Sequence, residues 1–313
     1  MKPEIAVLIP CYNEGQTIGK VVRDFKEALP EATVYVYDNN STDNTSQEAE
    51  AAGAVVCKEP MRGKGNVVRS MFRDIDADVY LMVDGDDTYP ADAARLMVDK
   101  VLREGYDMVI GDRLSATYFS ENKRFSRSIG NEMAKWWINL LFHAHIHDVL
   151  TGYRAMSFTF VKTYPVLYSG FELETEMTMH ALDRKCRVVE VPVNFRERPT
   201  GSFSKMKPIS DGLGVVKSFY LMVARFRPLV FFGLLFSVFF SAGLALLIYA
   251  AALFGHLGAC GRAFSLIGGG FFILCAFSSL IVGAVLNMQA KYARAKYMVS
   301  CNDFALKRKH LKV

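Results

Sequence analysis

Short apolar runs alternate with longer amphipathic segments over the first hundred or so residues. The apolar runs are strand-like and lie at 5–9, 33–37, 54–57, 79–83 and 108–110. The amphipathic segments are helix-like and lie at 18–29, 45–52, 66–74 and 91–103, and Thr45-Ser-Gln-Glu48 is a candidate capping box for the second. Strands and helices in alternation build βαβ units. The pattern therefore predicts a Rossmann-like α/β fold with a mainly parallel sheet.

Beyond this region the pattern predicts helices at 125–143 and 172–184 and a strand at 188–194. Segment 207–226 mixes bulky apolar with basic residues, which is typical of an amphipathic helix on a bilayer surface. No charged residue occurs in 229–254 or in 264–290. As a helix, each stretch covers roughly 39 Å, enough to cross a hydrocarbon core of about 30 Å. We expect a transmembrane hairpin, with a buried core helix as the alternative for each stretch.

The basic residues beside these stretches predict the orientation of the hairpin. They are Lys217, Arg225 and Arg227 before the first stretch and Lys291, Arg294 and Lys296 after the second. Because Lys and Arg are enriched on the cytoplasmic side, both outer ends are expected to be cytoplasmic. The predicted division is a cytoplasmic catalytic domain (1–206), a juxtamembrane amphipathic helix (207–227), two transmembrane helices (228–290) and a cytoplasmic basic tail (291–313). The expected location is the cytoplasmic, or inner, membrane.

The charge and cysteine content of the chain indicate which partners and which compartment to expect. The net charge of +5 is modest and lies partly beside the apolar stretches, where anionic lipid headgroups attract basic side chains. Nucleic-acid binding is not expected, because the soluble part has no basic stripe with interleaved aromatic residues. The six cysteines are scattered without a C-x-x-C pair, which is typical of free thiols in the cytoplasm.

A group of carboxylates follows the fourth predicted strand, where Val79-Tyr-Leu-Met-Val83 runs into Asp84-Gly-Asp86-Asp87. A buried strand cannot keep charges in its body, so they gather at its carboxyl end, where open α/β sheets bind ligands. Two carboxylates one residue apart suit Mg²⁺ or Mn²⁺, usually shared with substrate phosphates. For an isolated D-x-D, a solvated turn is the alternative.

Three other polar clusters follow the first three predicted strands. They are Pro10-Cys-Tyr-Asn-Glu14, Asp38-Asn-Asn-Ser-Thr-Asp43 and Arg62-Gly-Lys-Gly65. The glycines of the last cluster are expected to let the backbone approach a ligand, and Lys64 could meet a phosphate. Each cluster is a weak signal by itself. Four clusters after successive strands predict a binding site at one edge of the sheet.

The motifs P-x-Y-N-E, D-N-x-S-T-D, G-K-G and D-x-D, in this order and spacing, resemble the family-2 glycosyltransferases of the GT-A fold over roughly residues 1–205. Three further segments narrow the resemblance: Ser128-Ile-Gly-Asn131, Asp148-Val-Leu-Thr-Gly-Tyr-Arg154 and Arg198-Pro-Thr-Gly-Ser-Phe-Ser-Lys205. They are similar to the polyprenyl-phosphate branch, which includes dolichyl-phosphate mannose synthases and bacterial undecaprenyl-phosphate glucosyl- or N-acetylglucosaminyl-transferases. Two carboxyl-terminal membrane spans also fit that branch.

The resemblance implies roles for individual residues. The nucleotide sugar would be held by Pro10, Tyr12, Asn13, Glu14, Asp38, Lys64, Asp84, Arg198, Ser204 and Lys205. The acceptor phosphate would be held by Arg124, Arg127, Asn131 and Arg154. The metal, Mg²⁺ or Mn²⁺, would be held by Asp84 and Asp86, and catalysis would depend on Asp86, Arg124, Arg127 and Glu174.

The polyprenyl phosphate acceptor that the resemblance implies determines whether the reaction needs a general base. Sugar transfer to a hydroxyl normally needs a general base, whereas a lipid monophosphate, with a second pKa of about 6, is already largely dianionic near neutrality. We therefore expect an inverting, metal-dependent transfer of a hexose from a nucleotide sugar to undecaprenyl or another polyprenyl phosphate. UDP-glucose or UDP-N-acetylglucosamine is the favoured donor and GDP-mannose the alternative. The other functions weighed are a processive polysaccharide synthase and a non-catalytic nucleotide-binding membrane scaffold, and a homo-oligomer stays open.

Three details stay open at the level of the sequence. Asp87-Thr88 stand where close relatives often have Leu-Gln or Leu-Ser, so the third metal ligand could be Thr88, Asp87 or water. One of Glu172 and Glu174, with Glu174 favoured, is expected to position the acceptor or a basic partner, and an ordinary acidic helix start is an equal alternative. The histidines between His143 and His147 have no Cys or Glu nearby in a ligand spacing, so satisfied or surface histidines are expected rather than a zinc site.

Overall fold

The computed structural model describes residues 2–115, 125–170, 172–199, 220–253, 256 and 258–311, and the side chains of 125–131, 133 and 305–311 lie outside that description. The chain forms two compact units, one of residues 1–216 with 299–313 and one of residues 217–298. The finer division predicted from the sequence, at 206, 227 and 290, stays a prediction.

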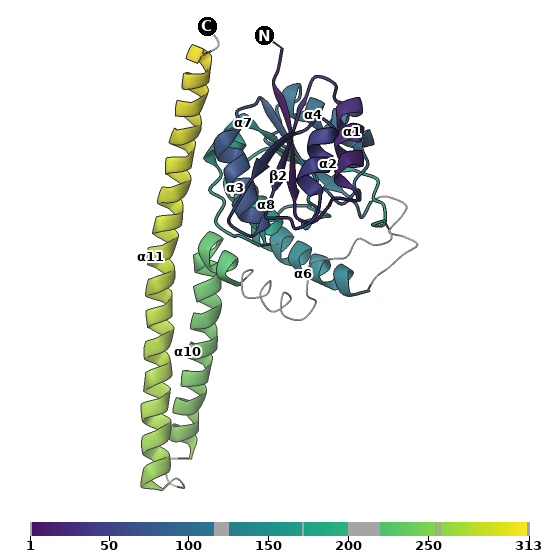
Figure 1. Cartoon of the computed structure of the whole chain (residues 1–313). Coiled ribbons are helices and arrows are strands. Elements are labelled where there is room, and N and C mark those ends of the chain that lie inside the picture. The colour runs from purple at the N-terminus through teal and green to yellow at the C-terminus, as the bar shows by residue number, and fades with distance from the viewer. Residues whose placement is uncertain are drawn as a thin grey trace. The chain divides into compact units, whose positions relative to one another are not determined.

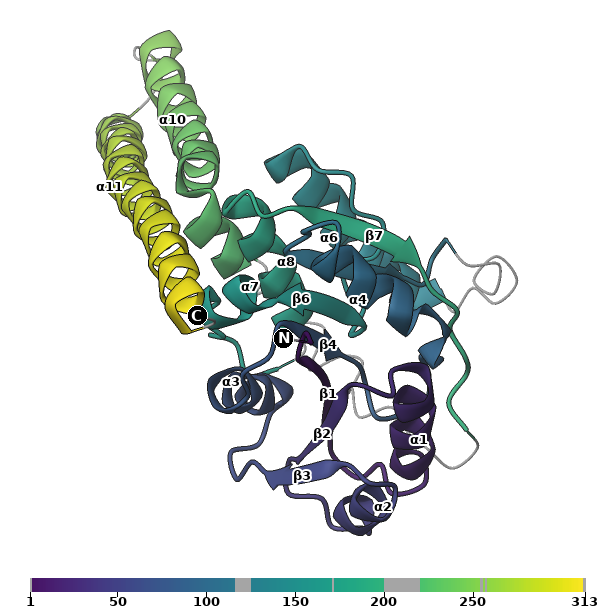
Figure 2. The same cartoon turned by 90° about the horizontal axis from the view of Figure 1, so that it is seen from above.

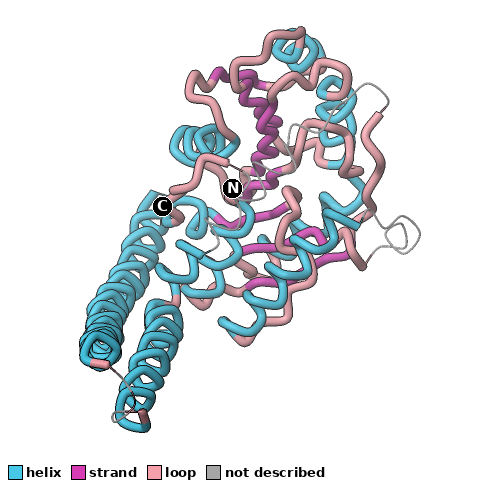
Figure 3. The backbone as a smooth tube through the Cα atoms, turned by 90° about the horizontal axis from the view of Figure 1, so that it is seen from below, coloured by secondary structure: helices cyan, strands magenta, loops and turns pink. Residues whose placement is uncertain are grey.

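A seven-stranded sheet forms the centre of the larger unit (Figure 1; strands magenta in Figure 3), in the order β3-β2-β1-β4-β6-β5-β7. The strands are β1 Ile5–Cys11, β2 Thr33–Asp38, β3 Val55–Lys58, β4 Val79–Met82, β5 Met108–Asp112, β6 Arg154–Ser157 and β7 Val188–Pro192. Among these strands, β6 runs antiparallel to β4 and β5, and the other pairs are parallel.

The register of the parallel strands places the polar clusters at one edge. Cys11 of β1 pairs with Asp38 of β2, and Asp38 pairs with Lys58 of β3. Leu8 of β1 pairs with Met82, the last residue of β4. The segments that follow these four strands therefore begin at the same edge of the sheet.

Helices cover both faces of this sheet (Figure 2). They are α1 Ile18–Ala28, α2 Thr45–Ala51, α3 Lys64–Asp74, α4 Ala94–Leu102, α6 Phe125–Phe142, α7 Phe158–Thr163 and α8 Leu173–Asp183. Helix α1 buries Ile18, Val21, Val22 and Phe25, whose spacing puts them on one side of a helix. These residues share a hydrophobic core with Val7 of β1 and Met97 of α4, while α3 and α7 lie on the opposite face. Each such buried side chain contributes about 1.5–3 kcal/mol.

The predicted α/β fold with a mainly parallel sheet is confirmed. Strand β6 and helix α7 were not predicted, because β6 has only four residues and begins with the charged Arg154. The capping box is wrong: Asn44 is the N-cap of α2, with no side-chain cap bond. The hydroxyl of Thr45 instead accepts a hydrogen bond from the Glu14 N–H at 2.9 Å, which joins α2 to the segment after β1.

The smaller unit contains two long apolar helices, α10 (Pro228–Ala252) and the first part of α11 (Ala259–Leu311), preceded by helical residues 220–226. The helices pack closely at Gly243, where an added Cβ would lie 2.9 Å from the Gly269 carbonyl oxygen. Apolar side chains such as Val238 and Ile267 point outward, 62% and 72% exposed. Both helices are largely exposed along their apolar stretches, and both are long and apolar enough to cross a membrane.

Candidate active site

Asp84 and Asp86 follow β4 directly, at the edge of the sheet where the sequence places them. Gly85 between them lies against β1, and an added Cβ would come within 2.7 Å of Cys11 Sγ. The Thr17 hydroxyl donates to the Gly85 carbonyl oxygen at 2.7 Å. Close packing against β1 therefore favours glycine at this position.

Asp84, whose side chain is 30% exposed, belongs to a partly buried group of three charged side chains from three elements. Lys64 Nζ, at the start of α3, lies 2.6 Å from Asp84 Oδ1 and 2.6 Å from Glu174 Oε1, in the first turn of α8. The side chains of Lys64 and Glu174 are only 17% and 6% exposed. A cation between two carboxylates offsets the desolvation of all three groups. Glu174 therefore lies against a basic partner, one of the two roles expected for it.

The electrostatics of this group keep Lys64 and Asp84 charged near neutrality. Burial would lower the pKa of Lys64, but the charges of Asp84 and Glu174 and their hydrogen bonds raise it above its ordinary value. Burial would likewise raise the pKa of Asp84, but the neighbouring Lys64 charge outweighs this and holds that pKa below its usual range. Asp84 is thus ionised at physiological pH.

Asp86 lies in a different environment. It is 3% exposed, its Oδ2 lies 2.5 Å from Arg198 Nη2, and its Oδ1 accepts a hydrogen bond from the Thr88 hydroxyl at 2.6 Å. Asp87 has a positive φ of 55°, and its carboxylate lies 2.8 Å from Lys20 Nζ. Thr88 and Asp87 are the two side chains considered for a third metal ligand. Thr88 lies beside Asp86, whereas Asp87 forms an ion pair with Lys20.

The segments after β1 and β2 are joined to each other by polar side chains. Asp38 is 6% exposed, and its two oxygens accept hydrogen bonds from the Ser41 N–H at 2.8 Å and the Ser46 hydroxyl at 2.6 Å. Asn13, with φ of 52°, accepts from the Thr42 N–H at 2.8 Å. Asp38 and Asn13 thus shape the turns beside the expected nucleoside site.

The segment after β1 also offers a ring surface at this edge. Pro10 and Tyr12 are both partly exposed, and the Arg62 guanidinium carbon lies 5.4 Å from the centre of the Tyr12 ring. The Glu14 carbonyl oxygen accepts the N–H groups of Thr17 and Ile18, so Glu14 begins the turn that leads into α1. Tyr12 and Arg62 together present an aromatic and a cationic group to this edge.

The glycines of G-K-G pack against the protein's own backbone, which corrects the expectation that they leave room for a ligand. An added Cβ at Gly65 would lie 1.8 Å from the Tyr168 carbonyl oxygen, and one at Gly63 would lie 2.5 Å from that of Ser169. The sequence interpretation also missed Asn39, whose side-chain oxygen accepts the Gly63 N–H at 2.7 Å. These contacts position Lys64 between its two carboxylates.

Arg154, predicted to hold the acceptor phosphate, is fully buried at the start of β6. Its guanidinium donates to the carbonyl oxygens of Thr151 and Val149 at 3.1 and 2.8 Å and to the Thr178 hydroxyl at 2.9 Å. This placement does not support contact with a phosphate, because the guanidinium is used inside the protein to join segment 149–151 to α8.

Segment 148–153 lies against the D-x-D turn, and the sequence interpretation missed the residues that hold it there. Arg113 donates to both oxygens of the fully buried Asp148, with Nε at 2.6 Å and Nη2 at 2.9 Å. The Tyr89 hydroxyl accepts the Gly152 N–H at 3.3 Å. An added Cβ at Gly152 would come within 2.4 Å of Asp84 Oδ2, so a larger residue here would displace the Asp84 carboxylate.

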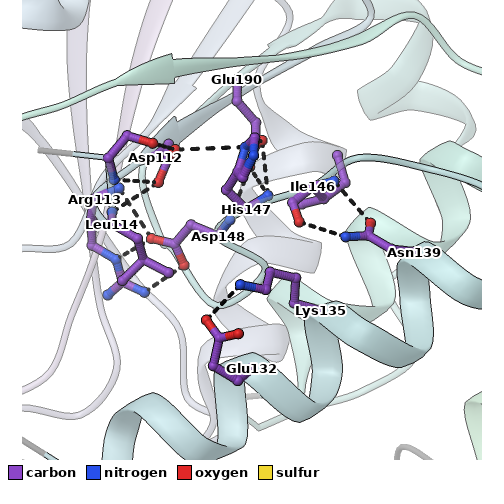
Figure 4. Close-up of polar contacts among 11 residues, drawn as sticks. Asp112, Arg113, Leu114, Glu132, Lys135, Asn139, Ile146, His147, Asp148 and Glu190 are labelled. Carbon is purple, nitrogen blue, oxygen red and sulfur yellow. Dashed lines mark hydrogen bonds and ion pairs between the residues drawn. The ribbon is translucent and has the colours of Figure 1, made fainter.

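His147 lies beside Asp112 and Glu190, with candidate ligand atoms within 4.8 Å of one another (Figure 4). His147 Nδ1 is 2.8 Å from Glu190 Oε2, but the Glu190 oxygens also accept the backbone N–H groups of His147 and Asp148 at 2.9–3.0 Å. Asp112 Oδ1 accepts the Leu114 N–H at 2.8 Å. Since these oxygens already face N–H donors, the cluster serves to join segment 146–148 to β5 and β7.

Several predicted residues are not placed by the structure. Arg124, Ser204 and Lys205 lie outside the described residues. Arg127 and Asn131 belong to α6, but their side chains are outside the description. The part of the site expected to meet the acceptor phosphate therefore stays a prediction.

Comparison with known proteins places this site in a family. The sequence profile described as glycosyl transferase family 2 matches residues 6–162. Glycosyltransferase AglJ of Haloferax volcanii is 36% identical over 248 residues, 79% of this chain and 81% of the relative. A dolichyl-phosphate hexose transferase of the same organism is 29% identical over 215 residues, 69% of this chain and 92% of the relative.

A solved structure with a similar fold is that of glucosyl-3-phosphoglycerate synthase from Mycobacterium tuberculosis, in complex with Mn²⁺, UDP and phosphoglyceric acid. Its TM-score is 0.57 at 21% identity, and the similarity covers 72% of this chain and 78% of the other. The likeness shows the GT-A fold.

Proposed function

This chain belongs to glycosyl transferase family 2, and we propose that it transfers a hexose from a nucleotide sugar to a polyprenyl phosphate, with inversion at the anomeric carbon. Two features support a lipid acceptor. One relative is named a dolichyl-phosphate hexose transferase, and two helices of this chain are long and apolar enough to cross a bilayer. The reaction would take place at the membrane surface.

The contact between Glu174 and Lys64 carries the proposal for a phosphate acceptor. A buried carboxylate near the D-x-D could serve a hydroxyl acceptor as general base, but Glu174 lies 2.6 Å from a lysine whose pKa is raised. Glu174 Oε1 is therefore used in an ion pair inside the protein, which supports an acceptor that needs no base. A phosphate monoester is largely dianionic near neutral pH, so its oxygen can attack the anomeric carbon without a base while the bond to the diphosphate breaks.

The two aspartates of the D-x-D fit a divalent cation. Both are carboxylates at the carboxyl end of β4, and each already lies within 2.6 Å of a positively charged side chain, which supports cation binding at this place. We propose that Asp84 and Asp86 hold Mg²⁺ or Mn²⁺. The ion would supply positive charge to stabilise the leaving diphosphate.

The chain's own cations complete the charge balance. Lys64 and Arg198 lie at the two aspartates, where the diphosphate would approach. Tyr12 and Arg62 would border the nucleoside, beside the turns shaped by Asn13 and Asp38. We propose that the acceptor phosphate is held by Arg124, Arg127 and Asn131, and that Ser204 and Lys205 close over the diphosphate.

We further propose UDP-glucose or UDP-N-acetylglucosamine as donor, with GDP-mannose as the alternative, and undecaprenyl phosphate as acceptor. The catalytic domain would face the cytoplasm, because basic residues flank both outer ends of the apolar helices. A homo-oligomer is compatible with this arrangement.

The proposal is tested with the full chain purified in detergent. The protein is incubated with Mg²⁺ or Mn²⁺ and each of the three radiolabelled donors, with undecaprenyl phosphate in one set and undecaprenol in a matched set. We expect labelled glycolipid from one donor, with the phosphate acceptor alone. Product from undecaprenol, or no product with the phosphate under any donor, would contradict the proposal.

A further inference from the structure

The ion pair between Arg198 and Asp86 raises the question of how a metal reaches Asp86. Arg198 Nη2 is 2.5 Å from Oδ2, and the Thr88 hydroxyl donates to Oδ1 at 2.6 Å. Mg²⁺ binds carboxylate oxygens at about 2.0–2.1 Å, so an ion on the side of Oδ2 that faces Arg198 would take the place of the guanidinium. Arg198 in its present position therefore competes with an ion for Asp86 Oδ2.

We propose, on the basis of the function proposed above, that Arg198 is an exchangeable counter-ion of Asp86. It holds the carboxylate until the metal and the nucleotide diphosphate arrive, and it then moves from the carboxylate to the diphosphate. Metal and nucleotide binding are thereby coupled, because the metal displaces Arg198 and the diphosphate gives the guanidinium a new anionic partner.

The two cations of the site differ in how firmly they are held. Lys64 belongs to helix α3, lies between Asp84 and Glu174, and is 17% exposed. Arg198 lies in segment 193–199, which has no regular secondary structure, and its side chain is 32% exposed. Of these two cations, Arg198 is the one that can change partners without disturbing a helix.

The backbone near Arg198 is held independently of the ion pair. The Arg196 N–H donates to the Thr88 carbonyl oxygen at 2.8 Å, and the Asn194 side chain donates to Asp92 Oδ2 at 2.6 Å. These contacts keep segment 193–198 beside the D-x-D turn when the guanidinium leaves Asp86. The exchange is thus a movement of one long side chain within a site that stays assembled.

The exchange predicts opposite effects of one substitution in two conditions. Without nucleotide, Arg198→Ala removes a competitor, so Mn²⁺ should bind about three- to tenfold more tightly, the range for a partly exposed charged hydrogen bond. With nucleotide, the same variant lacks a diphosphate ligand, so Mn²⁺–nucleotide should bind about tenfold or more weakly. A residue with a purely structural role would not produce this reversal.

Binding is measured on the full chain in detergent, by the loss of the free Mn²⁺ signal in electron paramagnetic resonance and by calorimetry with UDP and with GDP. Arg196→Ala is the matched control, because it removes an equal charge two residues away, from a side chain 3.5 Å from Asp87 rather than at Asp86. It should tighten Mn²⁺ binding clearly less than Arg198→Ala does.

Equal or weaker Mn²⁺ binding by nucleotide-free Arg198→Ala, or a gain matched by Arg196→Ala, would overturn the exchange while leaving the proposed transfer intact. Tighter binding without nucleotide and weaker binding with it would support the exchange. If neither wild type nor Arg198→Ala binds Mn²⁺ in any condition, both the exchange and the metal-dependent function are refuted. A circular dichroism melt of each variant confirms that the folded chain is compared.

Discussion

Replacing Glu174 by Gln separates a positioning role from a general base. The substitution keeps the shape and leaves an amide oxygen that can accept from Lys64, which also retains Asp84 at 2.6 Å. The Lys64 hydrogen bond to residue 174 would then have a neutral instead of a charged acceptor, which weakens it by about 1–2 kcal/mol. If this loss falls on the transition state, kcat/KM for glycolipid formation should drop about 5- to 30-fold, since 1.4 kcal/mol is about tenfold.

A general base would behave differently, because its removal typically costs 10²- to 10⁴-fold and abolishes the rise of rate with pH. Initial rates are measured between pH 5.5 and 8.5, together with the thermal midpoint, which should fall by about 2–8 °C for a loss of 1–2 kcal/mol. Glu172→Gln, at the same helix start, is the control and should retain nearly full activity. A drop of more than a thousandfold in Glu174→Gln, with a flattened pH profile, would refute the positioning role and the argument for a phosphate acceptor.

Three other substitutions test the surroundings of the site. Gly65→Ala should cost at least about 3 kcal/mol in thermal denaturation, because the new Cβ would lie 1.8 Å from the Tyr168 carbonyl oxygen, and an unchanged midpoint would contradict this packing. Arg154→Met should lower the thermal midpoint by leaving buried carbonyl groups unpaired, yet change the KM for polyprenyl phosphate less than about threefold; a selective rise in that KM would restore the acceptor role. Lys64→Met should raise the pKa of Asp84. In the wild type, the depressed Asp84 pKa contributes stability that is present above the unfolded value of about 3.9 and is lost as pH falls through the folded pKa. The variant lacks this contribution, so urea denaturation should show a smaller loss of stability on acidification than in the wild type, and superimposable pH curves would count against the ion pair.

The sequence alone was enough to predict the sheet, most of its strands and the edge where the polar clusters meet. These features depend on local patterns, because an apolar run of four or five residues between amphipathic helices has few other ways to be buried. The two apolar helices were predictable for the same reason, from length and the absence of charge. Strand β6 was missed because four residues beginning with a buried arginine carry no such pattern.

The tertiary structure decided which partner each polar residue has. Lys64 and Glu174 are 110 residues apart in the chain, and no spacing rule connects them. The pattern singled out the G-K-G glycines correctly, but only the fold shows that the backbone at Tyr168 and Ser169, rather than a ligand, fills the space beside them. Periodicity reports which side of an element is buried, whereas ion pairs and close backbone contacts depend on how distant elements are packed, and that is decided only when the whole domain has folded.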